Sequence, residues 1–487
     1  MRRGMFFAGL IAVIQMIITP LAMAVNITVT TTDDDDTTNG NCTLREAIFA
    51  AAADMVRDAC PAGSGVDTVY VPAGTYDLAL GEIYLSSDLI IEGESQLSTI
   101  IDGNNITNIF RRLGATSTVE IRDLTIRNGQ PPSGVFGGAL IQGSTYFTTF
   151  RNVTIIGCST DSRGGAIYIG GGVVTLIDCT FDNNESITYG GAIYMGGGEF
   201  KATRTTFMNN SVLSDTFGGG GVLYKGSVAG SVSFEDCTFS SNFGRFGGAI
   251  AALGEIVISG CWFHANVATS NGGALAPLGS GATTIVNSTF TTNRAGVSDP
   301  STSGGGAAIA TAGDMKIQNT TFVGNTRYTF GVLEGNSLSG SGAYIKNSIL
   351  EVSSGANCIG AMTSGGHNIT SDTSCGFSEV GDVSGVDPLL GGLADNGGLT
   401  MTHNPLPGSP AIDGGDPLGC TWDHDNNSGT TEIDVKTDQR WYTRPWDGDA
   451  NGSFICDPGS VEYGATDLLF GDDFESGTTS AWSAVVQ

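Results

Sequence analysis

A short acidic stretch near the C-terminus has the pattern of a calcium-binding loop. Asp447, Asp449 and Asn451 place oxygen-bearing side chains at alternate positions, and Gly452 follows them. Ca²⁺ prefers hard oxygen ligands, and such alternation before a glycine is typical of the start of a calcium loop. The glutamate expected at the twelfth position is missing, because Pro458 stands there.

A second, weaker candidate for a calcium loop contains Asp423, Asp425 and Asn427. Bound Ca²⁺ at either loop would make the segment between Cys420 and Cys456 more rigid. The sequence therefore predicts a structural role for Ca²⁺. The alternative is an acidic turn region that holds no ion.

Charged side chains inside the central part of the chain are the candidates for catalysis. Acid–base cleavage of a sugar polymer needs two or three carboxylates that converge on one groove, or carboxylates beside a basic residue. The candidates are Asp178, Asp182, Glu185, Glu199, Lys201, Arg204, Glu235 and Asp236. They form no paired-aspartate motif, so we interpret them as solvated strand and turn charges and predict no catalytic residues.

Histidine is scarce and scattered, at His264, His367, His403 and His424. A zinc site or a catalytic triad is not expected from such spacing. We expect His367 and His403 to form backbone hydrogen bonds in turns.

A repeated unit must position these residues. Its copies lie roughly 24 to 33 residues apart, a period typical of stacked supersecondary units. Each copy has a Phe, an Asn three positions later and a Gly-Gly pair. The Phe and Asn positions are Phe181/Asn184, Phe207/Asn210, Phe239/Asn242, Phe263/Asn266, Phe290/Asn293 and Phe322/Asn325. The Gly-Gly pairs start at Gly137, Gly164, Gly190, Gly220, Gly247, Gly272 and Gly305.

The residues upstream of each Phe are apolar or small at alternating positions, which is the period of a strand with one buried face. We expect the Asn to adopt a left-handed backbone and to bond the layers above and below, and the Gly-Gly pair to form another corner. One strand per layer, about 4.8 Å apart, predicts an all-β, right-handed parallel β-helix of the pectin-lyase-like kind, with roughly ten to twelve coils. Residues 67–76 read as the first coil, and residues 89–93 and 99–103 as the second and third.

The N-terminus has the features of a secretory signal peptide: two arginines, an apolar run over residues 5–18 and small residues up to Ala24. We predict a signal peptide over residues 1–24 and an N-terminal cap over 25–65 that contains a helix at 44–57. The β-helix repeats follow over 66–355, a module of C-terminal coils and a disulfide-pinned loop over 356–463, and a tail over 464–487. No segment after the signal peptide is apolar enough to span a membrane.

Cysteine usage agrees with export, because ten Cys residues in such a chain indicate an oxidising compartment. The predicted disulfides are Cys42–Cys60, Cys358–Cys375 and Cys420–Cys456. The cysteines inside the repeats are interpreted as core fillers: Cys158, Cys179, Cys237 and Cys261.

The formal net charge of -28 and the pI of about 4.2 argue against nucleic acid and anionic membrane surfaces as partners.

Three groups of motifs resemble known families. The segment from Cys42 to Ile48 resembles the N-terminal Cys-Ser-Leu-Arg-Glu-Ala motif of bacterial exported β-helix proteins, with Thr43 in place of Ser. The repeats are similar to those of chlamydial polymorphic outer-membrane proteins. Segments at 365–368, 387–391, 395–398, 408–413 and 437–440 are similar to the choice-of-anchor module of such proteins. The resemblance implies an exported β-helix, although the membrane barrel of the chlamydial proteins has no counterpart here.

These observations predict an adhesion, envelope or glycan-binding protein that is secreted or held on the outer surface of a Gram-negative bacterium. Its expected partner is a polysaccharide or a cell-surface protein, and we expect a monomer. The alternative is a polysaccharide lyase or glycoside hydrolase that acts on an outer groove of the β-helix.

Overall fold

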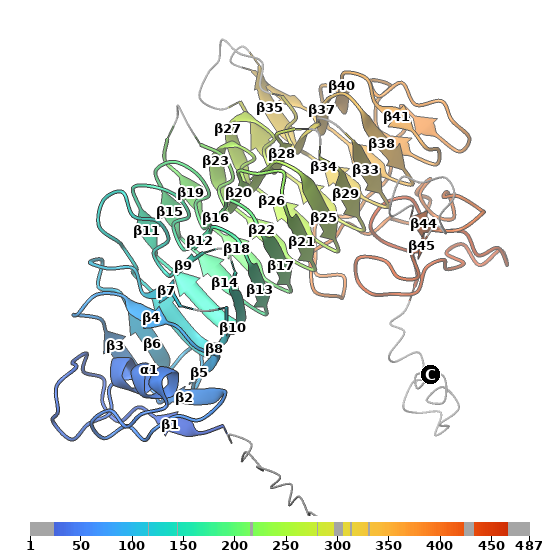
Figure 1. Cartoon of the computed structure of the whole chain (residues 1–487). Coiled ribbons are helices and arrows are strands. Elements are labelled where there is room, and N and C mark those ends of the chain that lie inside the picture. Colours follow the sequence, from blue (N-terminus) through green and yellow to red (C-terminus); the bar gives the residue numbers. More distant parts are fainter. Residues whose placement is uncertain are drawn as a thin grey trace, which may run out of the picture.

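The computed structural model describes residues 24–465, except for residues 115, 144, 215–217, 280, 297–304, 312–313, 330–331 and 423–432. Within this range the chain is a right-handed parallel β-helix with one short helix at its N-terminal end (Figure 1). The predicted fold class is therefore confirmed. Most of the predicted signal peptide and tail lies outside the described residues.

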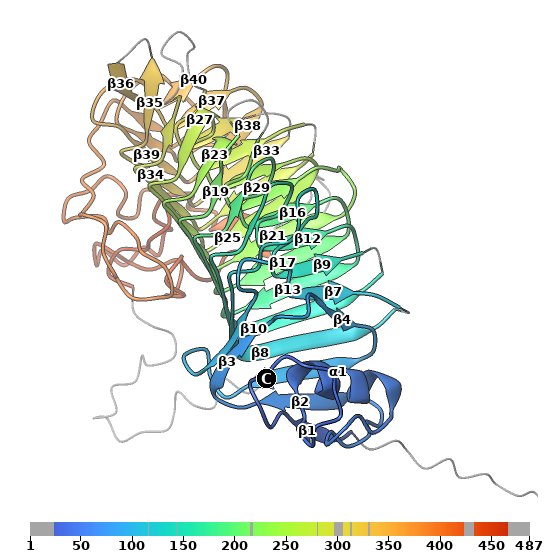
Figure 2. The ribbon, with the colours of Figure 1, turned by 90° about the vertical axis from the view of Figure 1, so that its left-hand side faces the viewer.

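The strands form three long sheets that run along the axis (Figure 2). The 24-stranded sheet contains two columns of strands separated by a corner. The first column contains β1 (Asn26–Thr28), β2 (Asp67–Val71), β5 (Leu89–Gly93), β13 (Val173–Ile177), β17 (Glu199–Thr203), β21 (Ser231–Glu235), β25 (Glu255–Ser259), β29 (Thr283–Val286), β33 (Met315–Gln318), β38 (Ala343–Lys346) and β41 (Thr363–Ser364). The second contains β3 (Gly74–Asp77), β6 (Thr99–Asp102), β14 (Thr180–Asp182), β18 (Thr206–Met208), β22 (Thr238–Ser240), β26 (Trp262–His264), β30 (Thr289–Thr291), β34 (Thr321–Val323), β39 (Ile349–Glu351), β42 (Ile369–Thr370) and β43 (Val383–Ser384). The long strands β8 (Thr118–Arg127) and β10 (Phe147–Ile156) belong to both columns.

The other two sheets close each coil. The 8-stranded sheet contains β11 (Ser159–Thr160), β15 (Glu185–Ser186), β19 (Ser211–Val212), β23 (Phe243–Phe246), β27 (Val267–Asn271), β31 (Arg294–Ala295), β35 (Thr326–Thr329) and β36 (Val332–Gly335). The 11-stranded sheet contains β4 (Ile83–Leu85), β7 (Phe110–Arg112), β9 (Leu140–Gln142), β12 (Ile167–Ile169), β16 (Ile193–Met195), β20 (Leu223–Lys225), β24 (Ile250–Ala252), β28 (Leu275–Pro277), β32 (Ile309–Thr311), β37 (Leu338–Gly340) and β40 (Cys358–Ile359). A separate antiparallel pair joins β44 (Thr421–Trp422) to β45 (Ile433–Asp434).

The prediction of one strand per coil was wrong, since a central coil contributes four strands. For the same reason β5 and β6 belong to one coil rather than to two. Strand β5 pairs with β2, and β6 pairs with β3, so both lie one layer above the first coil. The alternating pattern identified the strands but not the corner that divides each coil.

Corners between strands have a left-handed backbone. The first corner, between the two columns of the 24-stranded sheet, has φ between +46° and +65° at Asp123, Asn152, Asp178, Arg204, Asp236, Gly260, Asn287, Asn319 and Asn347. The second corner comes one residue before the repeated Asn, for example at Asn183 and Asn209. The prediction that the repeated Asn itself is left-handed was therefore wrong.

The repeated Asn residues instead point inward and form a continuous row of buried amides. For example, the side-chain oxygen of Asn210 accepts hydrogen bonds from the backbone N–H and the Nδ2 of Asn184 in the preceding layer, at 3.1 and 3.0 Å. The Nδ2 of Asn210 then donates to the Phe181 carbonyl below it and to the Oδ1 of Asn242 above it. The pattern repeats through Asn266, Asn293 and Asn325.

The repeated Phe residues stack beside this row. The rings of Phe239 and Phe263 have centroids 4.3 Å apart, and the next pair, Phe263 and Phe290, is 4.5 Å apart. All these rings are fully buried. Each repeat thus contributes one Phe ring to an apolar stack and one Asn amide to a row of hydrogen bonds.

The Gly-Gly corner is required because the backbone of the next residues lies very close. Gly164 has a φ of +67°, and a Cβ there would lie 2.2 Å from the Ile167 carbonyl oxygen. In the copy that starts at Gly305, the left-handed residue is Gly306.

The helix α1 (Leu44–Ala53) covers the N-terminal end of the β-helix (Figure 2). Thr43 caps it, since its hydroxyl accepts from the Glu46 N–H while the Glu46 carboxylate accepts from the Thr43 N–H. The helix ends before the predicted position 57, because Asp54 adopts a left-handed conformation.

The structure contains the three disulfides Cys42–Cys60, Cys358–Cys375 and Cys420–Cys456. Cys158, Cys179, Cys237 and Cys261 are unpaired and buried, as their interpretation as core fillers requires.

After the last coils the chain folds back and lies along the flank of the β-helix, beside β25, β29 and β33 (Figure 1). We call residues 386–465 the return segment. Gln439 enters the flank, where it bonds Thr289 and the Cys261 carbonyl. Thr400 donates to the Gly260 carbonyl.

Replacing one Asn in the row should destabilise the protein strongly. Asn210→Ala leaves the Asn184 N–H and the Phe181 carbonyl buried without their partners. An unsatisfied buried group costs roughly 1–3 kcal/mol, so we expect a loss of about 3 kcal/mol in the free energy of unfolding, measured by urea denaturation.

Asn209→Gly is the matched control, because Asn209 is the exposed, left-handed neighbour. Glycine keeps that backbone, so the change should stay within about 0.5 kcal/mol. Equal losses for the two variants would contradict the role of the buried row.

Candidate functional site

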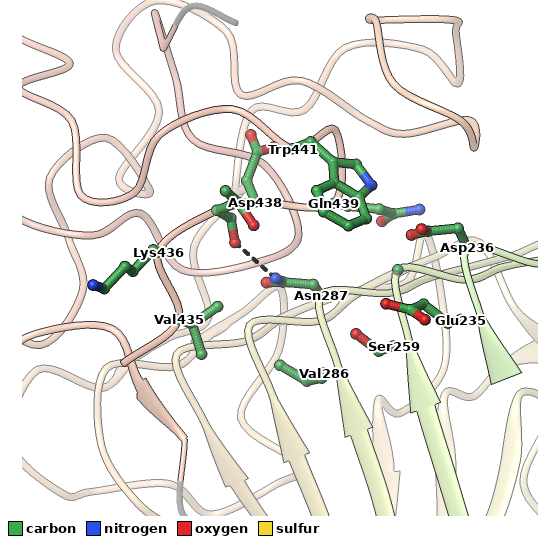
Figure 3. Close-up of a pocket in the computed structure, with 12 residues that line it drawn as sticks. Glu235, Asp236, Ser259, Val286, Asn287, Val435, Lys436, Asp438, Gln439 and Trp441 are labelled. Carbon is green, nitrogen blue, oxygen red and sulfur yellow. Dashed lines mark hydrogen bonds between the residues drawn. The ribbon is translucent and has the colours of Figure 1, made fainter. Parts of the chain in front are cut away.

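A pocket of about 220 Å³ lies where the return segment meets the first corner of the β-helix (Figure 3). One wall comes from the ends of β21, β25 and β29, and the other comes from residues 435–441 of the return segment. The lining residues are Glu235, Asp236, Ser259, Gly260, Val286, Asn287, Val435, Lys436, Thr437, Asp438, Gln439 and Trp441.

Asp236 is placed in this pocket by the corner geometry. It follows β21 directly and has a φ of +52°, which turns its side chain out of the strand register. In the next layer Gly260 occupies the same corner. A Cβ at Gly260 would lie 2.2 Å from the Asp236 Oδ1, so glycine leaves the space that the carboxyl group fills.

The Asp236 carboxyl group is buried, with only 7% of the residue exposed. Burial raises its pKa to about 7, and the neighbouring Glu235 carboxylate adds to the increase. The Trp441 side chain and the Arg204 guanidinium lower the pKa by less. The interpretation of Asp236 as a solvated turn charge was therefore wrong.

The other wall is a loop that is held by Asp438. The carboxylate of Asp438 accepts from the backbone N–H of Arg440 and of Tyr442, at 2.8 and 3.1 Å, and from the Arg440 guanidinium. With these bonds and a further one from the Glu462 N–H, Asp438 serves the loop structure rather than a ligand. The loop presents Trp441, which is 50% exposed and has a φ of +72°.

The charges in the pocket are divided between its two ends. Glu235 and Asp236 lie together beneath Trp441, whereas Lys436 extends away from them on the far side (Figure 3). The Asn287 side chain between them donates to the Thr437 carbonyl oxygen at 2.8 Å and closes the pocket floor.

Other charged residues of the repeats form local pairs. Arg204 bonds both oxygens of Asp178, at 2.7 and 2.8 Å, and Lys201 lies 2.7 Å from Glu199. These pairs are about half exposed, and such pairs contribute little stability. Their interpretation as ordinary strand and turn charges agrees with these contacts.

Three carboxylates come together at the first predicted calcium loop. Ligand oxygens of Asp413, Asp447 and Asp449 all lie within 4.8 Å of one another. The Asn451 side chain instead donates to Asp449, and its Oδ1 accepts from the Ser453 N–H. The sequence pattern missed Asp413, because its segment is brought to the loop only by folding.

Burial raises the pKa of Asp413, and the carboxylates of Asp449 and Asp447 raise it further. Such repulsion among like charges is what a bound cation relieves, so these residues fit Ca²⁺. The residues of the second predicted loop, Asp423, Asp425 and Asn427, lie outside the described residues.

Two histidines have the predicted role in turns. The Nδ1 of His403 lies 2.8 Å from the Gly391 carbonyl oxygen, and the Nδ1 of His367 lies 3.3 Å from that of Gly414. His264 stacks on Trp262, and His424 lies outside the described residues.

Comparisons with known proteins agree with the fold. Residues 137–299 match the family model described as "Right handed beta helix region". No curated protein matches the chain.

Two solved structures are similar over part of the chain. One is titled "Geobacillus virus E2 - ORF18"; it has 13% identity and a TM-score of 0.34, and the match covers 62% of this chain and 53% of that one. The other is a mutant of the PL6 family alginate lyase AlyGC, with 12% identity, a TM-score of 0.40, and coverage of 69% and 52%. The chain thus spans about half the length of each structure, and likenesses this distant carry no argument about activity.

Titration of Asp236 should make stability fall as the pH rises. Because its folded pKa of about 7 exceeds the unfolded value near 3.9, the native state binds more protons between these values. Protonation of Asp236 makes its full contribution to the free energy of unfolding below about pH 4. This contribution decreases as the pH rises to about 7, by at most roughly 4 kcal/mol.

The measurement is urea unfolding of the wild type and of Asp236→Asn at pH 5 and pH 8. The variant should lose less stability than the wild type over this range. Burial also raises the pKa values of Asp457 and Glu462, but these groups are present in both proteins, so their contribution cancels. Parallel pH dependences would show that Asp236 titrates normally.

Proposed function

We propose that this protein is an exported β-helix, secreted or associated with the cell surface, that binds glycans in the pocket beneath Trp441. The observation that carries the proposal is the half-exposed indole of Trp441 beside the buried Asp236 carboxyl group. The apolar face of a sugar ring packs against an aromatic side chain, while nearby polar groups bond and orient the sugar hydroxyls.

The size of the pocket limits what it holds. At about 220 Å³ it is smaller than typical ligand pockets of roughly 300–1,000 Å³. It therefore suits one sugar unit or the end of a chain. The rest of a polymer would lie along the ribbed flank, where successive layers repeat the same spacing.

Three disulfides support export, because such bonds persist in oxidising compartments. The charged and apolar N-terminal residues have the pattern of a signal peptide. No helix among the described residues has the length and apolar character that a membrane span needs.

Binding is favoured over cleavage because Asp236 lacks a suitable partner carboxylate. Glycosidases use two carboxyl groups that flank the scissile bond. In this pocket Asp438 is occupied by its loop, and Glu235 lies beside Asp236 at the same end of the pocket (Figure 3), so these two carboxyl groups are not on opposite sides of a bond. The raised pKa of Asp236 is the one observation that favours acid catalysis, so the assay below also measures cleavage of the glycan.

Removing the indole should abolish most of the binding. Trp441→Ala should weaken retention on a glycan array by about tenfold or more, since anchoring aromatic residues carry much of the binding energy. Phe454→Ala is the control, because Phe454 is an exposed aromatic residue elsewhere in the return segment.

The same array is assayed for released sugars. Cleavage that Asp236→Asn abolishes would replace the binding function with an enzymatic one. Binding that is unchanged by Trp441→Ala would place the glycan site elsewhere.

We also propose that Asp413, Asp447 and Asp449 bind a structural Ca²⁺. The ion would join the turn at Asp413 to the loop that precedes Cys456, and so hold two parts of the return segment together. Hard carboxylate oxygens are the donors that Ca²⁺ selects.

Removal of Ca²⁺ with a chelator should lower the melting temperature of the wild type by about 2–4 °C, the shift expected for a ligand that contributes one or two kcal/mol. Asp413→Asn should lower this response. Asp395→Asn, an exposed acidic residue of the same segment, should leave it unchanged. A melting temperature that is independent of the chelator would remove Ca²⁺ from the site.

A further inference from the structure

We propose that the sugar bound beneath Trp441 carries a free, positively charged amine, which lies between Asp236 and Glu235 and against the indole face. The ligand class is then an amino sugar with an unsubstituted amine. This inference rests on the proposed glycan-binding function and specifies its ligand.

The acidic end of the pocket holds no Lys or Arg among its described lining residues. Among the described residues, no Lys or Arg forms a salt bridge with Asp236. The nearest guanidinium in the corner column, that of Arg204, is bound by both oxygens of Asp178. Lys436 lies at the opposite end and extends away from the acidic pair (Figure 3).

The first corner leaves room for the carboxyl group of Asp236. The same corner position is Asn287 one layer above Gly260, and Gly260 itself provides the space that Asp236 occupies. The Trp441 side chain bonds the Asp236 carboxyl group but brings no charge. A buried carboxylate costs stability unless its charge is paired, so a cation from a ligand would supply the missing charge.

Trp441 is held in place by the loop that forms the other wall of the pocket. Its left-handed backbone is stabilised by the hydrogen bond from its N–H to the Asp438 carbonyl and by that from the Asp438 N–H to the Tyr442 carbonyl. The loop thus holds a half-exposed indole beside two carboxyl groups, and the Trp441 side chain hydrogen-bonds one of them, that of Asp236. An aromatic face beside carboxylates is a favourable site for an ammonium group. The net charge of -28 would also attract a cationic ligand.

Binding of an ammonium group has a consequence that a neutral sugar does not have. It lowers the pKa of Asp236 from its raised value. At pH 6 the free sugar amine is already mostly protonated, so the pocket releases the Asp236 proton to solvent when it binds the ligand. The charged groups that face or influence Asp236 are Glu235, Arg204, Lys436 and Asp438.

The test is calorimetric titration of the intact protein at pH 6 with three oligosaccharides of equal length: glucosamine, N-acetylglucosamine and glucose oligomers. Each titration is repeated in two buffers of different ionisation enthalpy, which reports proton release. We expect the glucosamine oligomer to bind about tenfold or more tightly than the other two, with proton release for it alone.

Variants separate the contributions. Asp236→Asn should remove the preference and the proton release, and Glu235→Gln should reduce the preference. Glu199→Gln is the matched control, since it removes an exposed carboxylate that lies outside the pocket. Thermal unfolding verifies that each variant is folded.

Equal affinity for the three oligomers, or tighter binding of the acetylated one, would overturn the inference and leave glycan binding intact. A preference for glucosamine that Asp236→Asn does not change would also overturn it. Failure of all three oligomers to bind would overturn the proposed function together with this inference.

Discussion

The structure depends on the row of buried amides that joins Asn184 to Asn325. In the inner layers, from Asn210 to Asn293, each side-chain oxygen accepts two hydrogen bonds and each Nδ2 donates two, so a polar group in the core has all its partners. A buried amide without these bonds would be destabilising, and the bonds form only when consecutive layers are in register. The row thereby fixes the register of the sheets, and the stacked rings of Phe181 to Phe322 add the apolar contacts beside it.

Register in turn determines where the functional groups lie. The first corner repeats its left-handed backbone from Asp123 to Asn347, so its side chains form one column along the flank. The return segment binds the upper part of this column, through Asn287, Asn347 and the flanking Thr289. Its interior contains the buried pair Arg444–Glu462, whose geometry fixes the position of the segment. The pocket arises where this cover ends, next to Asp236.

The sequence contains enough information to predict the solenoid, its buried Phe column, the capping helix and the three disulfide pairs, because each follows from local periodicity or local spacing. The number of strands in a coil was not predicted, although the first corner is Asp or Asn at seven of its nine positions and only Arg204 and Gly260 interrupt that pattern. Asp236 and Trp441 are 205 residues apart in the chain, so nothing local shows that they share a pocket. Asp413 likewise reaches Asp447 only through the fold, whereas the alternation of Asp447 and Asp449 is visible in the sequence.

Every amide in the Asn row points the same way, with its Nδ2 directed to the layer that follows in sequence. If one amide were flipped, its Nδ2 would face the Nδ2 of the preceding Asn and its Oδ1 would face the Oδ1 of the following Asn. No single amide can therefore reverse alone. The six side chains therefore share one polarity, and the components of their dipoles along the axis add. At ~3.5 D for each amide the sum stays below about 20 D, because each Nδ2 also donates to a backbone carbonyl of the preceding layer. The Asn row thus gives the core of the β-helix a net dipole along its axis, with the positive end at the later coils.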